Sequence, residues 1–110
     1  MEISENRTEK GLIIGITGRL DTTNYSVLEK KLMEHIDQGE HRMIVDCSRM
    51  DYVSSSGLRI LLMALKRITM VKGRFVLFGL QENIREIFEI SGFNNIFEIY
   101  QTQEEAAGTL

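Results

Sequence analysis

The sequence predicts an α/β fold in which a mixed, mostly parallel sheet and its helices follow one another in the order ββαβαβαβα. Short apolar runs rich in β-branched residues alternate with longer stretches whose apolar residues recur at helical spacing. After the first two runs, each run is followed by such a stretch, which is typical of parallel strands joined by right-handed crossovers. The chain has 110 residues, so residues 1–110 are expected to form a single domain.

The first two expected strands form a hairpin. Residues 1–6 alternate weakly between apolar and polar positions and are interpreted as an edge strand. Residues 12–16 are a short β-branched run and are expected to form the second strand. A turn at Lys10–Gly11 joins the two strands, and Gly18 is expected to end the second.

A helix and a buried strand are expected next. Residues of the capping type at 22–24 precede apolar residues at a spacing near 3.6, and Gly39 is expected just after the end of this helix. Residues 43–45 are apolar at successive positions, which suits a strand covered on both faces. Residues 47–53 are interpreted as a connecting segment that leads to a long helix opening at Ser54–Gly57.

The second half of the chain continues the alternation. The long helix presents a core stripe that consists of Leu58, Leu61, Leu62, Leu65 and Ile68. Gly73 ends it, and a buried strand is expected over 75–78. A short helix then ends at Ser91–Gly92, and its inward residues are expected to be Ile84, Ile87 and Phe88. A last strand over 96–100 and a final helix over 102–107 complete the prediction.

Composition excludes several classes of protein. Thirteen Lys and Arg against sixteen Asp and Glu give a net charge of −3, which argues against direct nucleic-acid binding. Cys47 is the single cysteine, so no internal disulfide can form and a reducing compartment is expected. The charged N-terminus lacks the apolar core of a signal peptide, and the apolar stretch 58–71 is too short and too charged to span a bilayer. These features predict a cytoplasmic protein without membrane insertion.

Candidate catalytic groups are few. His35 and His41 lack the spacing of metal ligands and are interpreted as surface residues, and Cys47 has no activating base nearby in sequence. Three aspartates follow expected strand ends, where α/β proteins place functional groups: Asp21, Asp46 and Asp51. Aspartate also caps helices and builds turns. We therefore expect no catalytic residues, no cofactor and no metal. The alternative is a small enzyme or nucleotide-binding protein that uses these aspartates.

Three serines and a glycine stand where a connecting segment turns into the long helix. One serine is enough to cap the helix, so at least one hydroxyl of Ser54, Ser55 and Ser56 is free. A helix N-terminus favours an added anion, so phosphate could be carried here without unfolding the protein. Arg59 is expected in the first helical turn, where a cation opposes the helix dipole. It either lies along the surface or meets an acidic partner or a phosphate.

Four segments carry a family resemblance. Gly18–Asp21 resembles a Gly-x-Leu/Ile-Asp motif, and Ile44–Ser48 resembles a Val-Leu-Asp-Leu-Ser strand. Val53–Leu58 resembles a switch with a hydrophobic residue before Asp-Ser-Ser-Gly-Leu, and Ile90–Phe97 resembles a closing helix-turn-strand. Each motif is weak alone, but their order and spacing across nearly the whole chain resemble a single STAS domain of the bacterial anti-sigma factor antagonist type.

This resemblance implies a fold and a mode of action. The implied fold is an open sheet wound as a right-handed β–α superhelix. The implied function is that the unphosphorylated protein binds and sequesters an anti-sigma factor that is also a serine kinase, which releases the sigma factor for transcription. Phosphorylation of the switch serine, which aligns with Ser55, breaks the complex, and a metal-dependent serine phosphatase restores it. The implied protein is not an enzyme and is a monomer or weak dimer.

The sequence departs from the family pattern at two positions beside the switch. Ser54 replaces the family's Asp, and Arg59 stands where Gly is common, so the charge that a kinase meets is altered. The expected partner-binding residues are Asp21, Thr22, Thr23, Ser54, Ser55, Ser56, Gly57 and Arg59. The alternative reading is a STAS subunit of a larger signalling assembly, or of a lipid-transport complex, without sigma-factor control.

Overall fold

The computed structural model describes residues 1–110 as one five-stranded sheet with four α-helices and a short 3-10 helix. The strands are β1 (Glu2–Thr8), β2 (Gly11–Leu20), β3 (Arg42–Val53), β4 (Arg74–Phe78) and β5 (Glu98–Tyr100). The helices are α1 (Tyr25–Asp37), α2 (Ser55–Met70), α3 (Glu82–Ile90), the 3-10 helix η1 (Phe93–Asn95) and α4 (Gln103–Ala107). The predicted α/β class and the order of the elements are confirmed.

The strands lie in the sheet in the order in which they occur in the chain, β1-β2-β3-β4-β5. β1 and β2 pair antiparallel as the predicted hairpin, and the remaining neighbours pair parallel. Each connection therefore advances the chain by one strand, as the superhelical arrangement requires. None of the helices is both long enough and apolar enough to cross a bilayer.

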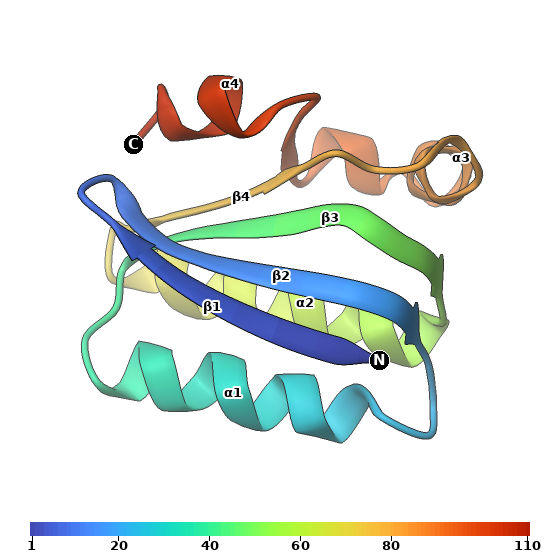
Figure 1. Ribbon diagram of the computed structural model, residues 1–110, viewed down its shortest axis with the longest axis horizontal. Coiled ribbons are helices and arrows are strands. Elements are labelled where there is room, and N and C mark those ends of the chain that lie inside the picture. The colour runs from blue at the N-terminus through green and yellow to red at the C-terminus, as the bar shows by residue number, and fades with distance from the viewer.

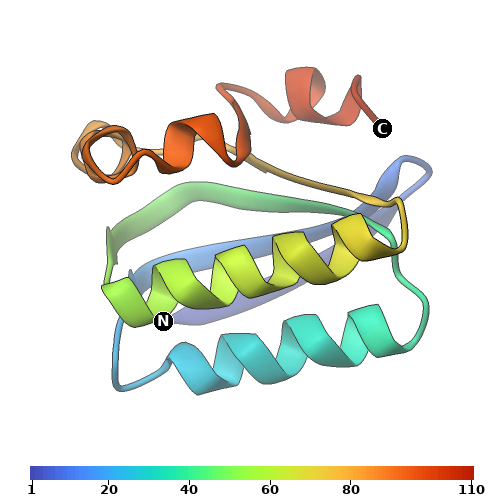
Figure 2. The same ribbon diagram turned by 180° about the vertical axis from the view of Figure 1, so that it is seen from behind.

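Different helices cover the two faces of the sheet (Figures 1 and 2), and the cores on the two faces differ in size. Helices α1 and α2 lie along one face, and 22 buried residues join them, with α3, to the sheet. On the other face α4 covers a smaller cluster of five buried residues: Ile13, Ile44, Val76, Phe78 and Ala106. Because side chains alternate along a strand, Leu12 and Ile14 of β2 enter the large core while Ile13 enters the small one.

The prediction that residues 47–53 form a connecting segment is wrong, because β3 continues through them to Val53. The register between β2 and β3 shifts twice, and each shift adds one residue to β3. Such β-bulges break the two-residue alternation that identifies a strand in a sequence. The residues of β3 that enter the large core are accordingly spaced by two from Met43 to Cys47 and then by three, at Met50 and Val53.

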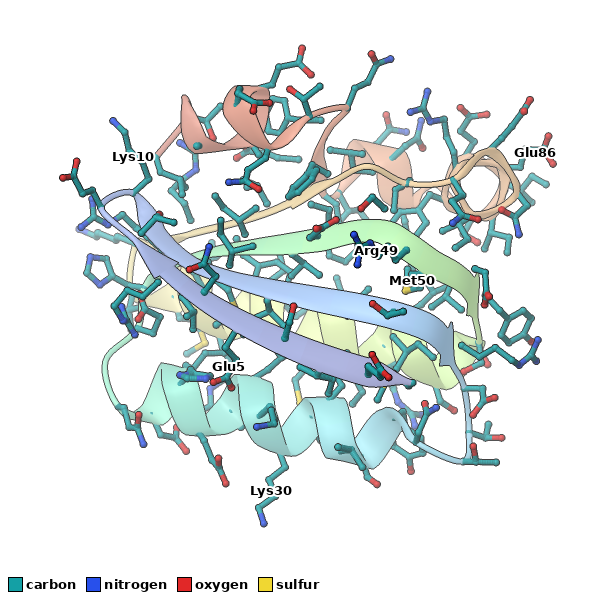
Figure 3. All side chains as sticks on the ribbon, viewed as in Figure 1. Glu5, Lys10, Lys30, Arg49, Met50 and Glu86 are labelled. Carbon is teal, nitrogen blue, oxygen red and sulfur yellow. The ribbon has the colours of Figure 1, made fainter.

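Side chains at the first bulge illustrate this change of spacing. Met50 is fully buried in the large core, whereas its neighbour Arg49 is exposed, and Figure 3 shows the two side chains pointing away from each other. Asp46, Cys47 and Asp51 are consequently residues within β3 and do not follow a strand end as expected. β2 likewise continues past Gly18, whose φ of 92° suits glycine, and ends at Leu20.

Other boundaries differ by a few residues. The last strand contains only Glu98–Tyr100, because the preceding residues form η1 and a turn in which Ile96 is 50% exposed. Gly39 follows the C-cap of α1 with a φ of 96°, as predicted for the residue after a helix. Thr102 precedes α4 and forms a capping box with Glu105.

Candidate functional site

The carboxyl ends of β2 and β3 bring the two expected site segments together. Leu20 is paired with Val53 in the sheet, and the Ser54 amide donates a hydrogen bond of 2.9 Å to the Leu20 carbonyl. The β2–α1 loop and the start of α2 therefore leave the sheet side by side. This placement agrees with the expectation that loops after parallel strands gather at one edge.

Ser54 is the serine that caps α2. Its Oγ accepts a hydrogen bond of 3.2 Å from the Gly57 amide, and its carbonyl accepts one of 2.9 Å from the Leu58 amide. The half-buried Ser54 hydroxyl thus satisfies one of the orphan N–H groups of the helix N-terminus. At the position where the family pattern has an aspartate, this chain keeps a capping oxygen and lacks a charge.

Ser55 and Ser56 are the first two residues of α2, and neither hydroxyl hydrogen-bonds to another group of the chain. Ser55 is exposed and Ser56 is half-buried. Their backbone N–H groups precede the first intrahelical hydrogen bond, so they too have no helical partner. Of the three serines, only Ser55 is both exposed and free of hydrogen bonds to its hydroxyl at the positive end of the helix.

Gly57 holds the first turn of α2 against the sheet. A Cβ atom at this position would lie 2.7 Å from Cγ of Leu20 and 3.0 Å from Cγ2 of Val53. Only glycine permits this close approach, and Gly57 itself is buried. Its contribution to the site is therefore to position the serines, and it offers no side chain to a partner.

Asp21 organises the β2–α1 loop through its own hydrogen bonds. Its Oδ1 accepts from the Thr23 hydroxyl at 2.6 Å and from the Thr23 amide at 3.0 Å. The hydroxyl and amide of Thr23, followed by Arg19, hold the pKa of the Asp21 carboxyl below its usual value. The Asn24 side chain closes the loop by accepting from the Asp21 amide, while Thr22 remains exposed.

A contact between Arg19 and Tyr52 borders this loop. The Arg19 guanidinium lies 4.1 Å from the centroid of the Tyr52 ring, and its Nε lies 3.5 Å from Oδ2 of Asp21. Tyr52 is 37% exposed because the second bulge of β3 places it opposite Arg19 at the end of the sheet. Neither residue was predicted to belong to the site, and Tyr52 was missed because residues 47–53 did not show the alternation of a strand.

Arg59 lies in the second turn of α2 and not in the first as predicted, because the helix begins at Ser55. It is exposed and makes no ion pair. With Leu62, Met63 and Lys66 it lines a shallow groove on the outer face of α2. Helix α2 contains no acidic residue, and its one ion-paired cation is Arg67, which contacts Asp37 of α1 at 2.9 Å.

The remaining candidate groups lie apart from this edge. Cys47 is fully buried, and burial raises the pKa of its thiol far above the usual value. The His35 ring of α1 and the Glu5 carboxylate of β1 are 2.9 Å apart, and this hydrogen bond lowers the pKa of Glu5. The only hydrogen bond of the His41 ring is with the carbonyl of Gly39. No three side chains of His, Cys, Asp or Glu are grouped so that they could share a metal ion.

Comparisons with known proteins agree with this geometry. The family model of the STAS domain matches residues 2–106. BtrV of Bordetella bronchiseptica, named as a candidate anti-sigma factor antagonist, is 38% identical over 107 residues, which cover 97% of this chain and 92% of BtrV. An anti-sigma-B factor antagonist of Listeria monocytogenes is 28% identical over 110 residues and covers 98% of this chain and 94% of its own.

A solved structure shows the same fold. The phosphorylated form of SpoIIAA, a Bacillus cell fate determinant, superimposes with a TM-score of 0.78 at 24% identity and covers 98% of both chains. At this identity the likeness shows the shared fold. The match to the family model over residues 2–106 spans all five strands of the sheet. The chain belongs to the STAS domain family and, within it, to the anti-sigma factor antagonists.

Proposed function

We propose that this protein is a binding regulator switched by phosphorylation of Ser55. In this proposal, the unphosphorylated form binds and sequesters an anti-sigma factor that is a serine kinase, and the sigma factor is released for transcription. Phosphorylation of Ser55 separates the complex, and a serine phosphatase reverses the modification. The protein acts in the cytoplasm as a single domain of residues 1–110, as a monomer or weak dimer.

The observation that carries the proposal is the state of the Ser55 hydroxyl. It is exposed, has no hydrogen-bond partner and stands at the first position of a 16-residue helix capped by the neighbouring Ser54. A phosphate at this place adds about −1.5 to −2 charges near neutral pH. It meets free N–H groups and the positive end of the helix dipole, so the fold tolerates it.

The proposed partner surface surrounds this hydroxyl. It includes the exposed loop residues Thr22 and Thr23, the ionised Asp21, the three serines and Arg59, with Gly57 beneath them. In a complex, a phosphate on Ser55 is pressed against the partner and loses water. Removing water from an ion costs several kcal/mol unless new bonds replace it, and this cost drives dissociation.

Binding is preferred to catalysis because no general base serves Ser55. Neither histidine contacts it, and the Asp21 carboxylate is occupied by Thr23 and Arg19. The names of the two sequence relatives also describe anti-sigma factor antagonists, and SpoIIAA has been solved in a phosphorylated form. A group that receives phosphate from another protein needs accessibility more than it needs an activating neighbour.

The test uses a serine-kinase anti-sigma factor encoded in the same genome. The wild-type chain and the variants Ser55→Ala and Ser56→Ala are each incubated with this kinase and ATP, and phosphate is mapped by mass spectrometry. We expect phosphate on Ser55, none in Ser55→Ala, and normal incorporation in the matched control Ser56→Ala. The unphosphorylated chain and Ser55→Ala bind the kinase, and the phosphorylated chain does not.

Two results contradict the proposal. Phosphate on a different residue shows that the switch lies elsewhere. Absence of both binding and phosphorylation with every such kinase, together with capture of transporter or signalling-assembly subunits from lysate, supports the alternative of a STAS subunit in a larger complex.

A further inference from the structure

Ser55 and Arg59 occupy the same face of α2, one turn apart. The helix is uninterrupted from Ser55 to Met70, so positions 55 and 59 have the i and i+4 relation. Residues in this relation have Cβ atoms about 5–6 Å apart. Helical side chains lean toward the N-terminus, so a long side chain at position 59 extends back toward the first turn. Both residues are exposed, and neither has a side-chain partner.

We propose that Arg59 binds the phosphate of phosphorylated Ser55 within the same chain. The inference rests on the proposed function in taking Ser55 as the modified residue. A guanidinium is planar and presents paired N–H donors that match the oxygens of a phosphate. An acidic group that precedes a cation by four positions is also the favourable order on a helix.

Other charged groups near this edge have partners of their own or lie farther along the helix. Arg19 contacts Asp21 and the Tyr52 ring, and Arg67 is paired with Asp37. Lys66 is the next cation of α2 that makes no ion pair, seven residues beyond Arg59. Asp21 of the adjoining loop is paired with Arg19, and no carboxylate forms an ion pair with Arg59. Arg59 is therefore the cation available to the phosphate.

This pairing gives one modification two effects on the surface. Before phosphorylation, Arg59 is a free cation on a helix that contains no acidic residue. After phosphorylation, the same cation is engaged by the phosphate, and the surface gains negative charge. A partner that places an acidic group against Arg59 thus loses an attraction and meets a repulsion together.

The experiment places phosphoserine at position 55 during translation of the full chain, so that no kinase is needed. Phosphorus NMR then measures the second pKa of the phosphate, which is ordinarily about 6. A paired cation favours the dianion and lowers this pKa. We expect Arg59→Gln to raise the phosphate pKa by about 0.15–0.4 relative to wild type, Arg59→Lys to give an intermediate value, and Lys66→Gln to leave it unchanged.

Lys66→Gln is a matched control, because it removes the same charge from the same helix at a distance where salt screens most of the interaction. All three positions tested are exposed, and a thermal melt of each variant shows that it is folded. Equal phosphate pKa values in wild type and Arg59→Gln overturn the inference, as does an equal rise in Lys66→Gln. Because the phosphoserine is introduced during translation, neither result depends on whether a kinase phosphorylates Ser55. That question is answered by the kinase experiment described under the proposed function.

Discussion

The two halves of β3 serve different purposes. In the first half, residues 42–46, the register with both neighbours is regular, and Met43, Ile44 and Val45 are fully buried on alternating faces. In the second half, residues 47–53, two bulges interrupt the register and pairs of neighbouring residues are exposed. The regular half binds the sheet together, whereas the irregular half turns side chains outward at the edge where Ser54 and α2 begin. Stability and the proposed binding should therefore respond to different substitutions.

The largest expected effect comes from a substitution in the regular half. Ile44 is fully buried in the small core, so Ile44→Ala should lower the free energy of unfolding by about 2–5 kcal/mol. Tyr52→Ala in the irregular half removes a 37% exposed ring and its contact with Arg19, and should cost about 1 kcal/mol or less. Urea denaturation followed by circular dichroism compares the two. Equal losses of unfolding free energy in the two variants would show that both halves of β3 contribute equally to stability.

Phosphorylation of Ser55 should act on binding and leave the fold intact. Phosphate at the exposed start of α2 is favoured by about 0.3–1 kcal/mol, so the melting temperature should hold or rise slightly. Loss of about 3 kcal/mol on desolvation would weaken binding to the proposed anti-sigma factor about a hundredfold. A thermal melt and a titration on the same sample measure both quantities. If the phosphorylated chain unfolds at a temperature many degrees lower, phosphorylation acts by destabilising the fold and not on binding alone.

Charge reversal on α2 separates the site edge from the rest of the helix. Arg59→Glu should weaken partner binding about tenfold more than Lys66→Glu, because Arg59 lies one turn from Ser55 and Lys66 about two turns farther on. Both residues are exposed, so neither variant should change the unfolding free energy by more than about 0.5 kcal/mol. Isothermal titration calorimetry measures the affinity of each variant for the partner. Equal affinities would show that the partner surface is not centred on the Ser55 end of α2.

The cap of α2 should contribute modestly to stability. Ser54→Ala removes the acceptor for the Gly57 amide and should cost about 1 kcal/mol. Ser54→Asp keeps a capping oxygen and adds a charge favoured at a helix N-terminus, so it should be at least as stable as wild type. Ser56→Ala is the control, since the Ser56 hydroxyl has no partner in the chain. Chemical denaturation of the three variants tests the assignment of Ser54 as the capping residue. A loss of stability in Ser56→Ala alone would show that Ser56 is the cap.

The smallest expected effect concerns Asp21. Its pKa is lowered chiefly by the Thr23 hydroxyl, so the ionised form contributes stability at neutral pH that is lost as the pH falls through the lowered pKa. Thr23→Ala should raise the pKa of Asp21 toward the ordinary value of about 3.9. A carbon-13 NMR titration of the carboxyl group below about pH 5 measures this change. If the pKa of Asp21 does not change in Thr23→Ala, the Thr23 amide and Arg19 account for its lowered value.

Patterns in the sequence predicted the regular half of β3 and failed on the irregular half for a physical reason. The run of apolar residues over 43–45 identifies a buried strand, but the bulges change the spacing of the buried residues to three at Met50 and Val53, which does not match a strand. The helices were predicted well because their apolar stripes and end signals are local. The last strand was predicted too long because Ile96 is apolar and yet half-exposed after η1.

The candidate site was located from the sequence, whereas its internal roles were not. Three adjacent serines can all cap a helix, and only the position of Ser54 opposite Leu20 decides which one does. The same register decides that Gly57 packs against Leu20 and that Tyr52 lies beside Arg19. These contacts join segments more than thirty residues apart in the sequence, so they cannot be predicted from the pattern of neighbouring residues.

The sequential order of the strands affects how the chain can fold while the ribosome is still making it. Every strand pairs with the strand synthesised before it, and none has to be inserted between two that are already joined. The sheet can therefore grow at a single open edge in step with translation. Until β4 has emerged, that edge is the regular half of β3, whose unpaired backbone and apolar residues can join those of another nascent chain. Early pairing of β4 with β3 would cover this edge and should reduce such association between nascent chains.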